Sequence, residues 1–401
     1  MTDNKKKEIK DLIDRLLGLV ENHSVKSDGL SCGKTGLALA YIYYGSCFHE
    51  YEYCYKGLGL IEEILQNIES ENSILRSMDL YSGLCGFLQV VNSVCKSGLL
   101  EIDMQDFSSL EALLYDWTMS EVRKDNHDFL LGPMGSLNYF INRLPNAGAE
   151  VFVKNILTVI VTKIEKNPSN GFSLKNTYYN KIDHRTVNEI NYSLAHGMSS
   201  LILNLIRLDT KGDQFGSLND TAYSMIDQFI KLNKDKNPSY PACFIGSFDC
   251  DNNDILLQKR LGWCFSSLNI VQILLEYKNR SGDPVFDQLI DESTDHLTKR
   301  LDFADTLVND AYLCHGALGI ALYYCHLKSL NGDVRFREAE DHWLTYGIDY
   351  YKKVGDEHFS ASDFTSTGDI SSFFYGPLGS MLCLISLYDN NLMDWSEIIL
   401  L

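Results

Sequence analysis

The chain has 401 residues, of which 45% are hydrophobic, and a formal net charge of −19 at pH 7. Such an acidic balance argues against a nucleic-acid-binding protein. The first residues lead directly into charged, helix-like sequence, and no apolar run approaches the roughly 20 residues of a membrane span. We therefore expect a cytoplasmic protein without a membrane span. The 11 cysteines, an odd number, argue against a disulfide framework, and most of them should be buried small side chains.

Residues 6–23 place apolar side chains at helical spacing between charged ones, which predicts an amphipathic helix. A Gly-x-x-Gly motif that leads into an apolar run then recurs along the chain. Seven copies separated by 49 to 69 residues indicate a helical repeat, because each interval has room for two helices. Glycines three residues apart lie on one face of a helix, where we expect them to let neighbouring helices approach closely. The copies begin at Gly33, Gly83, Gly132, Gly197, Ser266, Gly316 and Gly376; the fourth lacks the second glycine and the fifth lacks both.

Each repeat combines a polar amphipathic segment with a largely apolar one that starts at the motif. Residues 61–68 and 222–230 are examples of the first kind, and strand signals are few. Seven such hairpins could stack as an open solenoid or close into a ring. Closure buries both ends and brings the Gly-rich helix starts to one mouth, so we predict an all-α fold, an α/α toroid, in a single domain over residues 1–401.

Two stretches, residues 166–191 and 209–255, interrupt the repeat on either side of the fourth copy. They are polar and contain turn residues, among them Gly212 and Gly216. We expect long surface loops there or, within residues 209–255, a small insert. Loops on the mouth side would contact a substrate, whereas ordinary loop variation explains the same composition.

The residues just before the motifs should converge in a closed toroid, and Cys264, Cys314 and His315 among them make a plausible Cys2His set for zinc. Cys264 precedes the fifth copy, and Cys314 and His315 precede the sixth. Adjacent residues project about 100° apart in a regular helix, so this pair needs the irregular turn that Gly316 permits. Three protein ligands leave the fourth position of tetrahedral zinc open, which is typical of a catalytic site and would hold and deprotonate an incoming thiol.

Three further residues near the motifs can support such chemistry. His196 could transfer protons, Asp128 could orient it, and Arg260 could stabilise a developing negative oxygen. Each has a structural alternative. His196 could be a core histidine, Asp128 a helix cap, and Arg260 part of a solvated basic pair with Lys259. Cys264 could likewise be a core residue. Off the repeat pattern, and expected to be surface or packing residues, are His127, His184 and His326.

With these residues, the sequence resembles the lanthionine synthetase C-like family, the lanthipeptide cyclases. The matching segments are Leu194-Ala195-His196-Gly197, Gly262-Trp263-Cys264 and Leu313-Cys314-His315-Gly316. The Gly-rich helix starts extend the likeness over nearly the whole chain. The resemblance implies a toroid of seven inner and seven outer helices, with one zinc ion per chain bound by Cys264, Cys314 and His315.

The family reaction is the intramolecular Michael addition of a peptide Cys thiol to dehydroalanine or dehydrobutyrine, which forms a lanthionine or methyllanthionine ring. By resemblance, His196 is the acid–base residue, Asp128 its helper and Arg260 a further active-site residue. The implied partner is a dehydrated precursor peptide. The sequence leaves open whether the chain also docks on a dehydratase and a transporter, in a membrane-associated complex, or acts as a monomer. Phe265 and Ser266 depart from the expected Trp-Cys-Tyr-Gly, which removes a phenol and predicts a shifted helix start.

A standalone, zinc-dependent cyclase is the leading hypothesis, because the length fits a cyclase with no dehydratase or kinase region attached. The same zinc site could instead add glutathione to dehydroamino acids. A non-catalytic peptide-binding scaffold is a third hypothesis, motivated by the degraded fifth copy. Toroid glycosidases and terpene cyclases are the remaining rivals, but they use carboxylates or Asp-rich motifs, and the repeat mouths carry no convincing carboxylate set.

Overall fold

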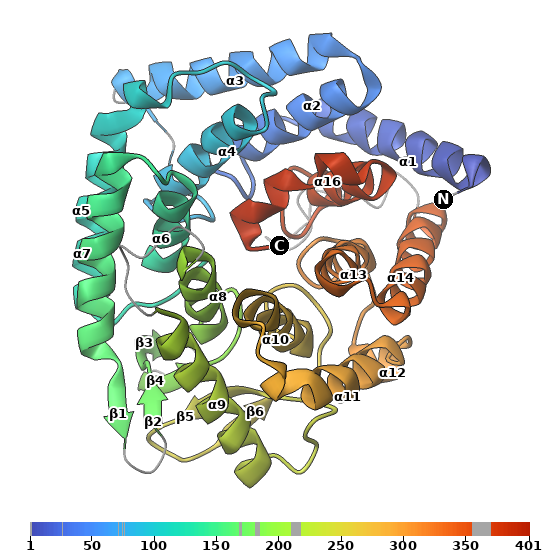
Figure 1. Cartoon of the computed structure of the whole chain (residues 1–401). Helices are drawn as coiled ribbons and strands as arrows, with labels where there is room; N and C mark the ends of the chain where they lie inside the picture. The colour runs from blue at the N-terminus through green and yellow to red at the C-terminus, as the bar shows by residue number, and fades with distance from the viewer. Residues whose placement is uncertain are drawn as a thin grey trace. The chain divides into compact units, whose positions relative to one another are not determined.

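The computed structural model describes residues 2–401 except 26, 71, 74, 76, 168–170, 181–184, 210–217 and 355–369. The described residues are mostly helical (Figure 1). They form two compact units: unit 1 comprises Met1–Leu110, Val308–His326 and Arg337–Leu401, and unit 2 comprises Glu111–Leu307 and Leu327–Phe336. The single domain over residues 1–401 stays a prediction.

An apolar helix starts directly after the first position of each of the seven Gly-rich copies. Most of these helices are buried over almost their whole length. In α4 and α16, for example, every residue is buried except at the C-terminal end. The seven are α2 (Lys34–Phe48), α4 (Leu84–Lys96), α6 (Pro133–Asn142), α8 (Met198–Asp209), α10 (Ser267–Ser281), α13 (Ala317–Asn331) and α16 (Pro377–Tyr388).

Half-exposed helices alternate with the apolar ones, as the sequence predicts. They are α1 (Asp3–Glu21), α3 (Tyr51–Glu69), α5 (Ser108–Arg123), α7 (Ala147–Lys163), α9 (Leu218–Lys236), α11 (Asp287–Thr298) and α14 (Val334–Lys353). Short helices complete the described set: η1 (Met104–Phe107), η3 (Pro284–Phe286), α12 (Phe303–Thr306), η4 (Asn390–Leu392) and η5 (Asp394–Ile399). In the part of the chain described, no helix is both long and apolar enough to cross a membrane.

Within each unit, neighbouring apolar helices pack on one another and on a half-exposed helix. In unit 1, α2 packs on α3, α4 and α16, and α1 packs on α16. In unit 2, α8 packs on α6, α9 and α10, while α6 packs on α7 and α10 on α11. This is the inner and outer pairing expected of the predicted hairpins.

Backbone hydrogen bonds join the loops that precede the apolar helices. In unit 2, the N–H groups of Phe129 and Leu130 donate to the Ala195 carbonyl at 3.1 and 2.9 Å. The N–H groups of Leu194 and Ala195 donate in turn to the Cys264 carbonyl at 3.0 and 3.1 Å. The residues before successive motifs therefore lie side by side within this unit. Unit 1 has the same type of hydrogen bond. The N–H groups of Cys314, Phe373 and Ser31 donate to the carbonyls of Phe374, Ser31 and Tyr81, respectively.

The second glycine of a motif lies against the chain's own preceding loop. A Cβ added at Gly379 would lie 1.8 Å from the Phe373 carbonyl oxygen, and one at Gly319 would lie 1.8 Å from that of Leu313. The Leu313 Cβ would lie 3.3 Å from the Cβ added at Gly379, so the approach of a neighbouring repeat is the looser of the two contacts. The glycines thus mainly admit a tight loop over the first helical turn, rather than a neighbouring helix as we expected.

Replacing Gly379 with alanine should therefore destabilise the protein by about 1–3 kcal/mol, because the new methyl group overlaps backbone that cannot move away cheaply. Urea unfolding followed by circular dichroism measures the change. Gly18→Ala is the matched control, since Gly18 lies in α1 and a Cβ there meets nothing within 4 Å. That control should be neutral or stabilising by up to about 1 kcal/mol. Equal unfolding midpoints for the two variants would contradict the packing role of Gly379.

The fifth copy starts its helix without glycine. Ser266 caps α10: its Oγ accepts from the Leu268 N–H at 3.1 Å, and Asn269 Oδ1 accepts from the Ser266 N–H at 3.1 Å. The Asn269 amide also donates to the Trp263 carbonyl at 2.8 Å, so side chains hold the loop in place. Because α10 begins at Ser267, directly after the first motif position as in the other copies, the predicted shift of the helix start is wrong.

Antiparallel strands occupy parts of the two stretches that interrupt the repeat. β1 (Glu165–Asn167) pairs with β2 (Gly171–Ser173). β3 (Asn176–Asn180), β4 (Arg185–Asn191), β5 (Ile245–Asp249) and β6 (Ile255–Leu257) form a sheet in that order, with Ile190 opposite Phe248. The second stretch also contains α9, so neither stretch is a plain loop. Residues 168–170, 181–184 with His184, and 210–217 with Gly212 and Gly216 lie outside the described residues.

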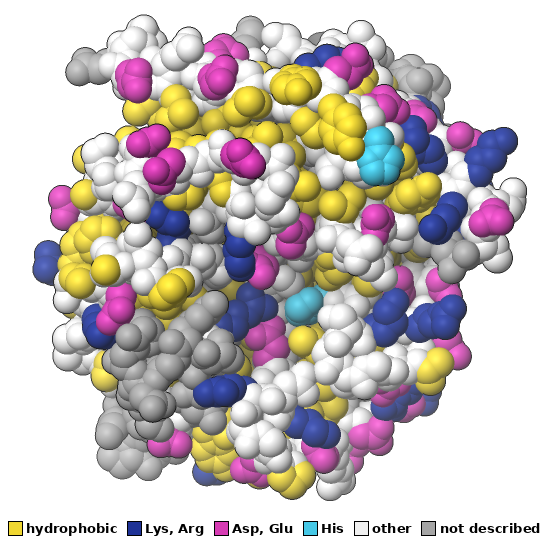
Figure 2. Space-filling model, turned by 45° about the horizontal axis from the view of Figure 1, so that its top comes forward, with side chains coloured by type: hydrophobic (Ala, Val, Ile, Leu, Met, Phe, Trp, Pro, Cys, Tyr) yellow, Lys and Arg dark blue, Asp and Glu magenta, His cyan; other side chains and the backbone are white. Residues whose placement is uncertain are grey.

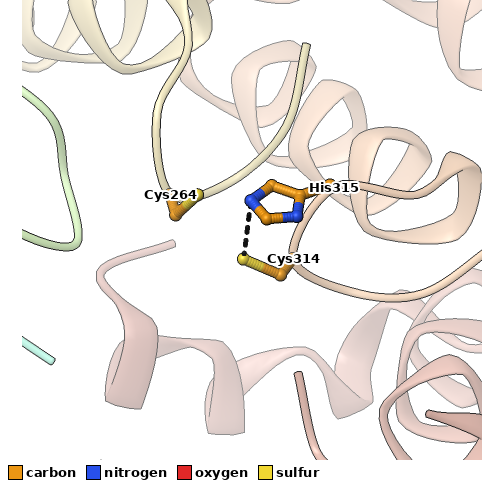
Figure 3. Close-up of side chains that lie close together, drawn as sticks. All are labelled: Cys264, Cys314 and His315. Atoms are coloured by element: carbon orange, nitrogen blue, oxygen red, sulfur yellow. Dashed lines mark hydrogen bonds between the residues drawn. The ribbon is translucent and has the colours of Figure 1, made fainter. Parts of the chain in front are cut away.

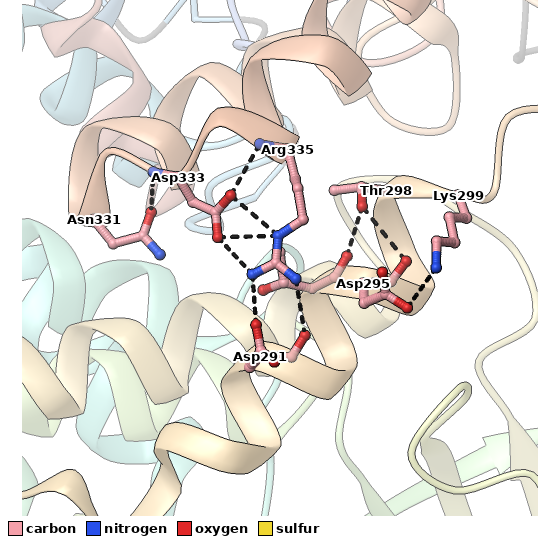
Figure 4. Close-up of polar contacts among 8 residues, drawn as sticks. Asp291, Asp295, Thr298, Lys299, Asn331, Asp333 and Arg335 are labelled. Atoms are coloured by element: carbon pink, nitrogen blue, oxygen red, sulfur yellow. Dashed lines mark hydrogen bonds and ion pairs between the residues drawn. The ribbon is translucent and has the colours of Figure 1, made fainter.

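Charged side chains form local pairs. Figure 2 shows acidic and basic side chains interspersed over one face. In unit 2, the Arg335 guanidinium contacts Asp291 at 2.8 Å and Asp333 at 2.7 Å (Figure 4). The hydrogen bond from Arg335 holds the pKa of Asp333 below its usual value. Because Arg335 binds both carboxylates, they connect α11 to the loop before α14 and have a structural role.

Candidate metal centre and proton-transfer pair

Cys314 and His315 lie in an irregular turn just before α13. Asp310 shapes this turn: its Oδ1 accepts from the Tyr312 N–H at 2.9 Å and its carbonyl accepts from the Ala317 N–H at 3.0 Å. Gly316 is required because a Cβ there would lie 2.1 Å from the Tyr312 nitrogen. The turn brings Cys314 Sγ to 3.4 Å from His315 Nε2 (Figure 3). Two such ligands of one tetrahedral zinc ion would be about 3.6 Å apart.

Cys264 supplies a third donor atom. One ligand atom from each of Cys264, Cys314 and His315 can be chosen so that all three lie within 4.8 Å of one another (Figure 3). Among the described residues this is the one group of three or more His, Cys, Asp or Glu side chains with metal-binding proximity. Cys264 is 7% exposed and Cys314 0%, whereas His315 is half-buried. Two sulfurs and an imidazole nitrogen form a donor set that suits zinc.

His196 and Asp128 form a direct pair in unit 2. His196 Nδ1 lies 2.7 Å from Asp128 Oδ2, and the other carboxylate oxygen accepts from the Leu131 N–H at 2.7 Å. The backbone N–H of His196 donates to Ser193 Oγ at 3.1 Å. This hydrogen bond holds the backbone from which the imidazole projects. Asp128 therefore both shapes its turn and orients the imidazole. The His196 side chain is 40% exposed, so it is not a core histidine.

Arg260 and His127 have different surroundings. Arg260 is exposed on the loop that leads to Cys264, and no hydrogen bond or ion pair of its guanidinium is found among the described residues. Its role in the site stays a prediction. His127 is buried, with Nδ1 3.2 Å from the Lys175 carbonyl oxygen, in agreement with a packing residue.

Phe265 packs against the sheet of unit 2. The tip of its ring, Cζ, lies 1.9 Å from the position that a Cβ would take on Gly246 in β5. A side chain at position 246 would overlap this ring, so Gly246 is what makes room for Phe265.

Tyr375 is a neighbour of the candidate ligands that sequence reasoning missed. Its hydroxyl lies 3.7 Å from Cys314 Sγ, and its ring centroid is 5.6 Å from that of His315. A signal was present, because Tyr375 directly precedes Gly376, just as His315 precedes Gly316. Tyrosine is common on inner faces, so this position alone did not point to the site.

The comparisons with known proteins agree with the helical repeat. The profile of the lanthionine synthetase C-like protein family matches residues 24–400. Nisin cyclase is similar in structure with a TM-score of 0.72 and 16% identity, over 100% of this chain and 99% of that chain. This likeness and the alternation of helices confirm the predicted α/α toroid fold.

Other likenesses are weak. The GH76A alpha-1,6-mannanase from Salegentibacter sp. HEL1_6 has a TM-score of 0.48 and 9% identity, over 98% of this chain and 99% of that chain. An inactive variant of that enzyme in complex with alpha-1,6-mannotriose has a TM-score of 0.47 and 10% identity, over the same shares. Both are too distant to carry an argument, and a search of curated proteins found no match. The family profile covers nearly the whole chain, and the chain therefore belongs to the lanthionine synthetase C-like family.

Proposed function

We propose that this protein is a zinc-dependent lanthipeptide cyclase. It would add Cys thiols of a dehydrated precursor peptide to dehydroalanine or dehydrobutyrine and so form lanthionine and methyllanthionine rings. The observation that carries the proposal is the group of Cys264, Cys314 and His315 in a chain of this family. The likeness in fold to Nisin cyclase supports it. A dehydratase and a transporter as further partners stay predictions.

Cys264, Cys314 and His315 would hold one zinc ion per chain. When bound, zinc supplies a coordination position for the substrate thiol and lowers the pKa of that thiol. Both cysteines are buried, whereas His315 is half-buried. A set of three protein ligands would leave the fourth position of tetrahedral zinc for the substrate thiol, as in catalytic zinc sites.

The addition balances without a leaving group. The substrate sulfur forms a bond to the β-carbon of the dehydro residue, and the π electrons move toward the α-carbon and its carbonyl. His196 Nε2 would accept the proton that the thiol loses and then donate a proton to the α-carbon, while Asp128 holds Nδ1. The carboxylate also stabilises the protonated imidazole. Arg260, on the loop of Cys264, is the candidate to stabilise the negative oxygen of the enolate.

Incubating the zinc-loaded protein with a dehydrated precursor peptide tests the function. Cyclisation leaves the peptide mass unchanged, because the thiol adds across a double bond, but it removes free thiols. We expect peptide cysteines to become resistant to alkylation, which mass spectrometry detects as missing adducts. If every peptide cysteine remains alkylatable with zinc present, the cyclase proposal fails. Adding glutathione to a dehydrated peptide without cysteine separates the alternative, since glutathione addition would increase the peptide mass.

A further inference from the structure

The seventh Gly-rich copy contacts Cys314 through both its backbone and a side chain. The Phe374 carbonyl accepts from the Cys314 N–H at 3.0 Å, and the hydroxyl of the next residue, Tyr375, lies 3.7 Å from Cys314 Sγ. Both contacts lie within unit 1. They place this sulfur against a neighbouring loop that includes a phenol.

Tyr375 is itself held in place. Its N–H donates to Ser372 Oγ at 3.0 Å, and Gly376, the next residue, caps α16 with Pro377 at the first helical position. The Tyr375 ring is tilted by 43° against that of His315, with 5.6 Å between the centroids. The phenol therefore contacts both adjacent ligand candidates from a fixed backbone, and its hydroxyl cannot move far from the sulfur without breaking these contacts.

The chemistry of sulfur decides which group donates in this contact. A thiol can donate its S–H to the phenol oxygen, whereas a metal-bound cysteine is a thiolate and can only accept. The phenol must then donate its O–H to sulfur. Hydrogen bonds of this kind orient metal ligands and tune the metal that they hold.

We propose that Tyr375 is a positioning residue, which donates an O–H···S hydrogen bond to the metal-bound Cys314 and thereby sets the zinc affinity of the centre. The inference rests on the proposed zinc site and adds a residue to it. Tyr375 would act through Cys314 and His315, whose geometry it restrains, and not on the substrate. Tyr375 belongs to the seventh copy and is distinct from position 265 of the fifth copy, where a tyrosine was expected and where Phe265 packs against Gly246.

Tyr375→Phe tests this inference, because it removes the hydroxyl and keeps the ring beside His315. We expect zinc to bind about 10- to 100-fold more weakly, measured by competition with a chromophoric chelator. The sulfur-to-cobalt charge-transfer band of the cobalt-substituted protein should also shift, which a role in folding alone would not produce. The matched control is Tyr312→Phe, two residues from Cys314, since the Tyr312 ring packs edge-on against that of Tyr350, with 6.3 Å between the centroids. The control should keep the wild-type zinc affinity and cobalt spectrum.

The outcomes separate the two proposals. If the wild type and Tyr375→Phe bind zinc equally tightly with identical cobalt spectra, the role of Tyr375 is wrong and the zinc site stands. If Tyr312→Phe weakens zinc as much as Tyr375→Phe, the effect belongs to the loop and the specific hydrogen bond is refuted. If the wild type takes up no zinc, both proposals fail.

Discussion

Replacing Cys264 with alanine is expected to remove zinc from the purified protein. Four protein ligands bind structural zinc with about 10–16 kcal/mol, so one ligand contributes about 3 kcal/mol, which is about two decades in Kd. A site that begins with three protein ligands should not hold its ion through dialysis after such a loss. Cys314→Ala and His315→Ala should behave in the same way, and metal analysis by mass spectrometry gives the zinc content per chain.

The control for the zinc experiment is Cys32→Ala. Cys32 is half-buried and directly precedes Gly33 in the first copy, so it shares its position in the repeat with His315. It lies outside the group of three donor atoms, and its replacement should leave the zinc content unchanged. Zinc retained at the wild-type level by Cys264→Ala, or lost equally by Cys32→Ala, would disprove the ligand assignment.

The loss of zinc should be separable from a loss of folding. The Cys264 carbonyl, and not its side chain, accepts the hydrogen bonds from Leu194 and Ala195, so alanine preserves these links. We expect added zinc to raise the melting temperature of the wild type, because a ligand that binds only the folded state stabilises it. Cys264→Ala should fold but show no such rise.

The positions of the apolar helices could be predicted from the sequence because each start requires a local backbone feature. Gly379 and Gly319 admit loop carbonyls that no other residue would tolerate, so the motif marks the helix start directly. The fifth copy shows the limit of this reasoning. Ser266 and Asn269 stand in place of the glycines, and their side-chain hydrogen bonds fix the start of α10 at the equivalent position. A search pattern based on glycine therefore wrongly scores this copy as degraded.

The candidate ligands could be predicted for a similar reason. Residues at equivalent positions of a repeat converge once the loops are joined, as the hydrogen bonds to the Ala195 and Cys264 carbonyls illustrate. The strands were not predictable in the same way, because β3 and β4 consist largely of polar residues without clear alternation. Tyr375 was missed because nothing in the residue type separates a phenol beside a ligand from one in the core.

Replacing His196 with alanine should slow cyclisation by a factor of about 10²–10⁴ and leave zinc bound, because proton transfer is lost while the three ligands remain. The rate is measured as the disappearance of alkylatable thiol from a dehydrated precursor, with zinc content determined on the same sample. His296→Ala is the control, since His296 is an exposed histidine on α11 and should be neutral. An equal rate in His196→Ala and the wild type would refute the acid–base assignment.

Asp128→Asn should give a smaller loss, of about 10- to 100-fold, because a charge-assisted hydrogen bond contributes about 1.5–3 kcal/mol. The amide oxygen of asparagine can still accept from the Leu131 N–H, so the turn should persist. If Asp128 acts by holding His196 Nδ1, its replacement should have no further effect once His196 is alanine. Rates that multiply in the double variant would instead mean that the carboxylate contacts the substrate or shapes the site independently. The double-mutant cycle therefore distinguishes an orienting carboxylate from a second catalytic group, which the 2.7 Å distance alone does not.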